Sequence, residues 1–244
     1  MRLLRLGEDG QFTQKEFTGK AIPRYAILSH TWGEDDQEVS FEDVRTGSGN
    51  NKAGYVKLQF CAQQAASDGL DYFWIDTCCI DKASSTELSE AINSMFRWYR
   101  NADRCYVYLA DVTDLDDKFA SSSDGLWRYE FQQSKWFTRG WTLQELLAPT
   151  SVEFFTAKGK QLGDKHSLFG DIFKATGIPF KAVVDPMSLS LFSVEERLSW
   201  AADRDTKREE DAAYALLGLF DLSMPLVYGE GRKRAFNRLH RELQ

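Results

Sequence analysis

The sequence contains no apolar run close to the ~20 residues that a helix needs to cross a bilayer. Its first segment, Met1–Gly10, is charged and lacks the apolar stretch of a secretory signal peptide. Cysteine is scarce, and the four cysteines all lie in apolar segments: Cys61, Cys78, Cys79 and Cys105. We therefore expect a soluble, cytoplasmic protein with no membrane span, whose thiols are free, buried and kept reduced.

Long basic tracts and metal-binding patterns are missing as well. The formal net charge is −7 at pH 7, which disfavours non-specific binding to nucleic acid or to anionic lipid. The cysteine spacing offers no zinc ligand set, and Gly229–Lys233 lacks the spacing of a phosphate-binding loop. A protease nucleophile at Cys78 or Cys79 is disfavoured because both follow an apolar strand. We predict no metal, no cofactor and no nucleic-acid partner, and we interpret the basic residues near the C-terminus as a solvated helix face: Arg232, Lys233, Arg234, Arg238 and Arg241.

What the sequence does contain is an alternation of short apolar runs and amphipathic stretches. With 244 residues, 43% of them hydrophobic, the chain can bury the core of one large domain. The alternation predicts an α/β fold with a parallel sheet covered by helices. The predicted strands are Tyr25–Ser29, Asp71–Asp76, Cys105–Leu109 and Val152–Phe155, and the predicted helices between them are Gly54–Asp68, one that begins after Ser84, and Trp141–Leu147.

The pattern becomes helical after about residue 165. Ser193 with Glu196 and Thr206 with Glu209 have the spacing of capping boxes, and Arg232–Leu243 is amphipathic. We predict a single domain over 1–244, with an α/β core over about 23–165 and a helical C-terminal extension over about 166–244. The sequence is equally compatible with a piece of a longer protein.

Three motifs stand out: AILSHTWG over 26–33, FWIDTCCID over 73–81 and TRGWTLQEL over 138–146. In this order, and followed by Tyr228-Gly229-Glu230-Gly231 and Ala235-Phe236, they resemble the HET (heterokaryon incompatibility) domain of fungal incompatibility and NLR-like proteins. The resemblance covers nearly the whole chain. It implies a cell-death effector module of fungal innate immunity, which acts by self-association or is activated by a neighbouring NLR-type domain or another partner.

A more distant resemblance links the chain to TIR domains, which have a flavodoxin-like parallel sheet. TIR enzymes carry a W-x-x-x-E pattern on the helix after the third strand, and its Glu cleaves NAD; here the pattern is Trp141 to Glu145. The resemblance implies a TIR-like core and an NAD glycohydrolase activity, in which NAD or a related nucleotide is the substrate and no redox cofactor is needed. Whether the chain is an enzyme stays open, because fold does not determine function.

Glu145 is the candidate catalytic residue. Trp141 and Glu145 are four residues apart and so share one helix face, where the indole would desolvate the carboxylate and raise its pKa. A carboxylate beside the ribose can stabilise the oxocarbenium-like centre formed when the nicotinamide–ribose bond breaks. The alternative is an exposed helix glutamate above a core tryptophan.

The other candidates would bind the substrate. Ser29, His30, Trp32 and Gly33 follow the first strand, where open α/β sheets bind ligands, and Trp32 could stack on a flat ring. The second motif adds Trp74 and Asp76, and the third adds Arg139, a possible pyrophosphate ligand, and Trp141. Each has a structural alternative: a turn with one buried Trp, a hydrogen-bonded structural His, a helix cap or a surface salt bridge.

A function without catalysis is the second hypothesis. The chain could signal only by oligomerising and contacting other proteins. The two hypotheses differ in whether Glu145 opens into a cleft, on the same edge of the sheet as Ser29 and Asp76.

Overall fold

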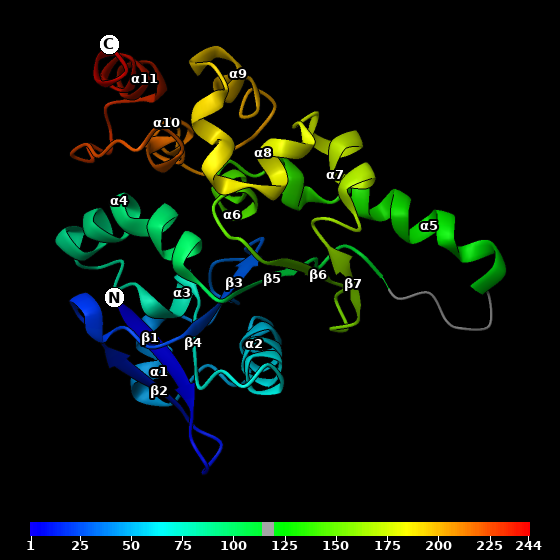
Figure 1. The fold of residues 1–244 in the computed structure, drawn as a ribbon. Coiled ribbons are helices and arrows are strands. Elements are labelled where there is room, and N and C mark those ends of the chain that lie inside the picture. Colours follow the sequence, from blue (N-terminus) through cyan, green and yellow to red (C-terminus); the bar gives the residue numbers. More distant parts are fainter. Residues whose placement is uncertain (114–119) are drawn as a thin grey trace.

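The computed structural model describes residues 1–113 and 120–244, and its centre is a seven-stranded mixed sheet (Figure 1). The strand order is β2-β1-β4-β3-β5-β6-β7. The four central strands β4, β3, β5 and β6 are parallel, whereas β1 pairs antiparallel with β2 and β4, and β7 pairs antiparallel with β6. The strands are β1 (Arg2–Leu6), β2 (Phe12–Glu16), β3 (Tyr25–His30), β4 (Tyr72–Trp74), β5 (Arg104–Tyr108), β6 (Val152–Phe155) and β7 (Gln161–Asp164).

The predicted parallel sheet is confirmed, and its four predicted strands are β3, β4, β5 and β6. All six residues of β3 are buried, as expected for a strand covered on both faces. One boundary was wrong: Asp76 does not end the second strand. The ladder stops at Trp74 because the carbonyl of Ile75 accepts hydrogen bonds from the backbone N–H groups of Cys78 and Cys79, which turns the chain into a short helix.

Helices cover both faces of the parallel strands. Helix α2 lies on one face, and α4 and α6 lie on the other (Figure 1). This division follows from right-handed crossovers, since the chain moves one way along the sheet from β3 to β4 and the other way from β4 to β5 and β6. The helices of this part are α1 (Phe41–Thr46), α2 (Tyr55–Ser67), α3 (Asp76–Cys79), α4 (Ser85–Asn101), α5 (Ala120–Gln133) and α6 (Thr142–Leu147), with the 3-10 turns η1 (Gly19–Ala21) and η3 (Lys135–Thr138).

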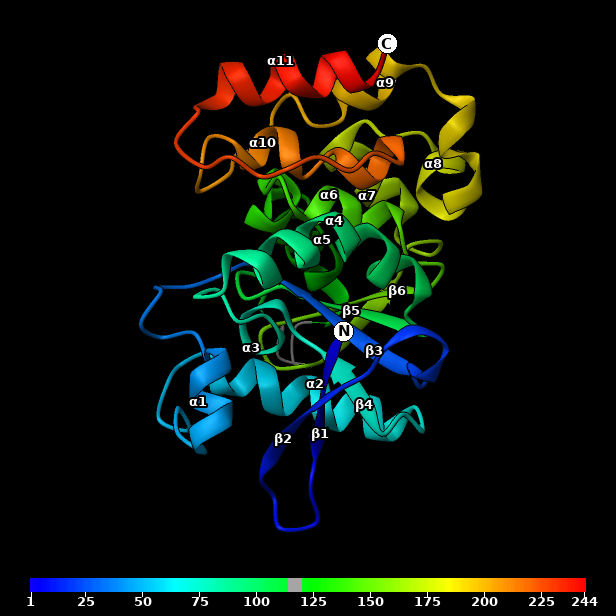
Figure 2. The same cartoon turned by 90° about the vertical axis from the view of Figure 1, so that its left-hand side faces the viewer.

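The region after β7 is helical, as predicted, and its helices α9, α10 and α11 lie above α4 and α6 (Figure 2). The capping box of Ser193 and Glu196 is present at the start of α9. That of Thr206 and Glu209 was a wrong prediction: Thr206 Oγ1 donates to the carbonyl of Arg208, and the next helix begins only at Asp211. The elements here are α7 (Phe169–Thr176), α8 (Phe180–Val184), η4 (Pro186–Leu191), α9 (Val194–Ser199), α10 (Asp211–Tyr214), η5 (Leu217–Phe220) and α11 (Arg232–Glu242).

The cysteines and the apolar character of the helices can be compared with the expectations from sequence. All four cysteines are buried free thiols, as predicted. Within residues 1–113 and 120–244, no helix combines the length and the apolar character that crossing a membrane requires.

Candidate functional site

The first and third motifs meet in the core between the sheet and helix α6. Ser29 Oγ at the end of β3 donates a hydrogen bond to Glu145 Oε2 on α6. The same hydroxyl accepts a hydrogen bond of 2.7 Å from Trp136 Nε1. Ser29 is fully buried and Glu145 is only 7% exposed. Two residues that are far apart in sequence are thus joined by one buried polar contact.

Burial dominates the chemistry of Glu145. It raises the pKa of this carboxyl to about 8, and the negative charge of Asp76 acts in the same direction, whereas hydrogen bonding to Ser29 opposes the shift. The direction of this pKa shift matches the expectation from sequence. The tryptophan that was expected beside Glu145 is a different one, because the Trp141 indole Nε1 donates to Asp211 in the extension. The indole joined to Glu145 through Ser29 is that of Trp136. At neutral pH, Glu145 in this structure holds a proton.

The first and second motifs form a separate hydrogen-bonded group at the strand ends. His30 Nε2 lies 3.1 Å from Asp76 Oδ1, and Trp32 Nε1 donates to Asp76 Oδ2 at 2.9 Å. Since consecutive strand residues point to opposite faces, His30 and Ser29 serve different groups. Burial alone would raise the pKa of Asp76, but the hydrogen bond with His30, helped by the charge of Lys82 and the hydrogen bond from Trp32, holds this pKa below its usual value. Asp76 is therefore ionised.

The loop that carries Trp32 is fixed by a buried ion pair. Glu38 pairs with Lys57 of α2, and Glu38 Oε1 also accepts a hydrogen bond of 2.7 Å from the Gly33 backbone N–H. Lys57 Nζ donates to the carbonyl of Thr31 at 3.0 Å. The Gly33 N–H is therefore already used within the protein.

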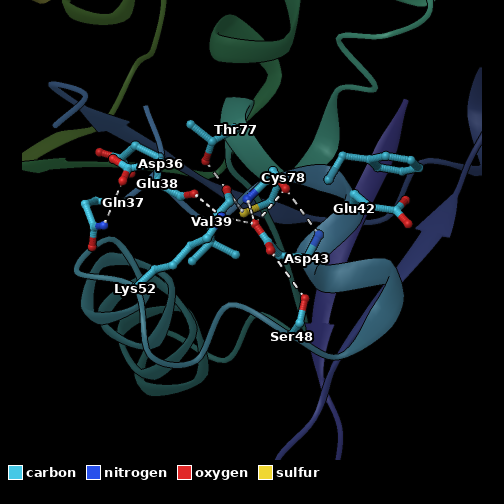
Figure 3. Close-up of polar contacts among 12 residues, drawn as sticks. Asp36, Gln37, Glu38, Val39, Glu42, Asp43, Ser48, Lys52, Thr77 and Cys78 are labelled. Atoms are coloured by element: carbon cyan, nitrogen blue, oxygen red, sulfur yellow. Dashed lines mark hydrogen bonds and ion pairs between the residues drawn. The ribbon is translucent and has the colours of Figure 1, made fainter. Parts of the chain in front are cut away.

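The rest of this loop is held by a second polar cluster around Asp43 (Figure 3). The Asp43 carboxylate accepts from Ser40, Ser48 and Lys52, and Cys78 Sγ donates to the Val39 carbonyl. These contacts tie the segment between β3 and α2 to the second motif.

Two of the remaining candidates lie away from these groups. Trp74 is fully buried and packs edge-on against Trp98 and Tyr99, with ring centroids 5.6 and 5.9 Å apart. Arg139 forms an isolated parallel β-bridge with Asp205 of the extension. Its two hydrogen bonds run from Asp205 N to Thr138 O (2.7 Å) and from Gly140 N to Asp205 O (2.8 Å). Neither side chain is joined by a hydrogen bond to Ser29, Asp76 or Glu145 among the described residues.

The arginine beside Glu145 is Arg204 of the extension, which the sequence did not single out. Its guanidinium is buried and donates to the Arg139 carbonyl at 2.9 Å and to Thr142 Oγ1 at 3.0 Å. Burial lowers its pKa to about 10, an effect that the charge of Glu145 opposes. Its Nη2 has no hydrogen-bond partner among the described residues. Only tertiary structure brings this residue to the site, since about 60 residues separate it from the third motif.

The site is closed in this structure. We expected the three motifs to line one cleft, and they do converge, but Glu145 is covered. Two surface hollows of about 520 and 290 Å³ lie elsewhere, one along α4 beside Leu226 and one between α2 and the turn at Gly159. Across the described parts of the chain, no group of three or more His, Cys, Asp or Glu residues could hold a metal ion.

Fold and site together define an α/β protein whose three sequence motifs meet around a buried, protonatable carboxyl group and an ionised aspartate. Residues 25–125 match the family model described as "Heterokaryon incompatibility protein (HET)". The chain is also 53% identical, over all 244 of its residues, to "Vegetative incompatibility protein HET-E-1" of Podospora anserina, and it spans 18% of that protein's length. No solved structure matches. The chain therefore belongs to the heterokaryon incompatibility (HET) family, as its three motifs predicted.

Proposed function

We propose that this chain is a cell-death effector domain of heterokaryon incompatibility, which hydrolyses NAD or a related nucleotide when it is clustered. The observation that carries the proposal is the contact between Ser29 and Glu145, because it joins the first and third motifs at one carboxyl group. Perturbed acids that gather with other polar groups are typical of catalytic sites.

The order of the parallel strands supports a TIR-like core for the proposed chemistry. Numbered along the chain, the four parallel strands have the spatial order 2-1-3-4, which flavodoxin-like sheets share. Ser29, His30 and Asp76 lie at or just after the carboxyl ends of β3 and β4, the edge where such sheets bind ligands. Glu145 occupies the Glu position of the W-x-x-x-E pattern.

Catalysis requires Glu145 to change state. In the closed structure it is neutral near pH 7, and a neutral carboxyl cannot stabilise an oxocarbenium centre by charge. Exposure to water would lower its pKa toward the ordinary glutamate value and release the proton. Clustering by self-association, or by an NLR-type neighbour, would supply the free energy for this opening.

The test is NAD consumption by concentrated purified protein, followed by chromatography of the products. We expect Glu145→Gln to lose roughly a hundredfold or more of the rate, the usual cost of removing a transition-state charge partner. The matched control is Glu90→Gln, an exposed glutamate on α4, which should retain the wild-type rate. Equal rates for wild type and a folded Glu145→Gln variant would refute the catalytic role.

One observation favours the alternative, a non-catalytic module that acts by oligomerisation: Glu145 is buried and bonded within the protein. Expression of both variants in fungal cells separates the two functions. Loss of killing with Glu145→Gln, at equal soluble expression and equal oligomer size, supports the enzyme. Full killing by the same variant supports the module.

A further inference from the structure

The ring face of Trp32 is occupied by a cation from the same chain. Lys82 Nζ lies 3.7 Å from the centroid of the Trp32 ring. Trp32 is 37% exposed, which is unusual for so large an apolar side chain, and Lys82 is exposed beside it. A cation above an indole face is attracted by the negative face of the ring.

The indole is rigidly held at its polar edge and along its backbone. Its Nε1 donates to Asp76 Oδ2 at 2.9 Å. The backbone groups on either side of it, the Thr31 carbonyl and the Gly33 N–H, are bound by the Lys57–Glu38 pair. An exposed aromatic side chain that is fixed in this way loses little conformational entropy when a ligand stacks on it.

A carboxylate completes the surroundings of the Lys82 ammonium. The Asp76 side chain is 20% exposed and ionised, and the charge of Lys82 is close enough to help keep its pKa low. The oxygens of Asp76 are oriented by His30 and Trp32. An aromatic face beside a carboxylate attracts cations, and a flat cation gains stacking area that an ammonium group does not.

We propose that Trp32 and Asp76 form a binding site for a flat cationic heteroaromatic ring of the pyridinium class, and that Lys82 occupies this site as an internal competitor. The ring's identity as the nicotinamide of an oxidised nucleotide rests on the proposed function. Its placement fits that reaction, because Asp76 is close enough to Glu145 for its charge to act on it.

The charge of the ring gives the site a way to release its product. When the bond between ribose carbon and ring nitrogen breaks, both bonding electrons go to the nitrogen and the ring becomes neutral. Water supplies the oxygen that bonds to the ribose carbon, and its proton goes to solvent. The neutral ring then loses its attraction to Trp32 and Asp76, and Lys82 returns.

The probes that test this site are 1-methylnicotinamide, which is a pyridinium cation, and nicotinamide, which has the same ring without the charge. Binding is followed by NMR at the Trp32 indole N–H, assigned with Trp32→Phe. We expect Lys82→Met to bind 1-methylnicotinamide about two- to fivefold more tightly than wild type, the equivalent of one exposed cation–π contact. Nicotinamide should bind more weakly than the cation to both proteins.

Three variants serve as controls. Lys82→Arg keeps a competing cation and should bind as wild type does. Lys233→Met removes an exposed lysine on α11 and should change nothing. Asp76→Asn, which keeps an acceptor for Trp32, should abolish the preference for the cation. Equal affinities of wild type, Lys82→Met and a second neutral variant, Lys82→Gln, would overturn the proposal, as would equal binding of the two probes.

The result is independent of hydrolysis. Glu145→Gln should still bind 1-methylnicotinamide, since Glu145 is not part of the ring site. If no NAD is consumed but Lys82→Met binds the cation more tightly, the ring site stands and the proposed function fails. If NAD consumption depends on Glu145 but the Lys82 variants bind alike, the ring site fails and the proposed function stands.

Discussion

Replacing Glu145 by glutamine should change how the stability of the protein depends on pH. Burial raises the pKa of Glu145 from 4.5 to about 8 in the folded state. In the unfolded chain the same carboxyl titrates at its ordinary value. Below about pH 4.5 both states are protonated, so this group contributes no pH dependence to the stability there.

As the pH rises from about 4.5 to about 8, the unfolded state releases a proton that the folded state keeps, so folding stability falls by about 1.4 kcal/mol per pH unit. Over the whole interval the loss is roughly 3–5 kcal/mol, and it levels off above pH 8, where both states are ionised. A raised folded-state pKa therefore contributes stability at low pH that is lost as the pH rises.

Glu145→Gln removes this dependence because the amide stays neutral at every pH. Its oxygen can still accept the hydrogen bond from Ser29, so near pH 5 the variant should lie within about 1 kcal/mol of wild type. Near pH 9 it should be more stable than wild type by roughly 3 kcal/mol or more.

The assay is urea unfolding followed by tryptophan fluorescence, for both proteins, between about pH 5 and about pH 9. All other titrating groups are shared, so they cancel in the difference between the two free energies of unfolding. A difference that stays constant across this range would refute the buried, protonated state of Glu145. Glu90→Gln should show wild-type pH dependence and serves as the control.

Two further predictions concern the docking of the extension on the third motif. A Cβ at Gly140 would overlap Thr206 Cγ2, so Gly140→Ala should destabilise the protein by about 1–3 kcal/mol in thermal unfolding. The control is Gly170→Ala, which has open space around its Cβ and should be neutral or stabilising. Equal effects of the two substitutions would contradict the close contact at Gly140. Trp141→Phe should cost about 1 kcal/mol in urea unfolding, because it loses the hydrogen bond to Asp211. If this structural role is the main one, the variant should consume NAD at close to the wild-type rate. A selective loss of activity in the folded variant would instead support the predicted role of Trp141 in binding the substrate.

The sequence was most informative where both faces of an element are buried. Each of the four parallel strands was found from its apolar run, because burial on both faces favours apolar residues, although single polar residues such as Glu153 of β6 remain among them. Strands β1, β2 and β7 were missed. They are half-exposed, and their polar residues, such as those of Phe12–Glu16, give no pattern distinct from a loop.

For the site, the sequence predicted what strand topology dictates. Ser29 and Asp76 were expected near Glu145 because the ends of parallel strands gather on one edge; Ser29 does contact Glu145, and Asp76 acts on Glu145 through its charge. Trp136 and Arg204 were not predicted, since neither has a local signal and each reaches the site through tertiary packing. The closed state of Glu145 could not be predicted either, because it depends on how the extension packs.

The pairing of residues 138–140 with Asp205 has a consequence for exchanging segments between relatives. Arg204 and Thr206 contact the third motif through the Arg139 carbonyl and the Cβ-less face of Gly140, and Asp211 holds Trp141. A chimera that takes residues 138–146 from a relative but keeps residues 204–211 of this chain would pack the relative's segment against a surface complementary to the original one. The two segments should therefore be exchanged together, and active hybrids should arise when both come from the same parent.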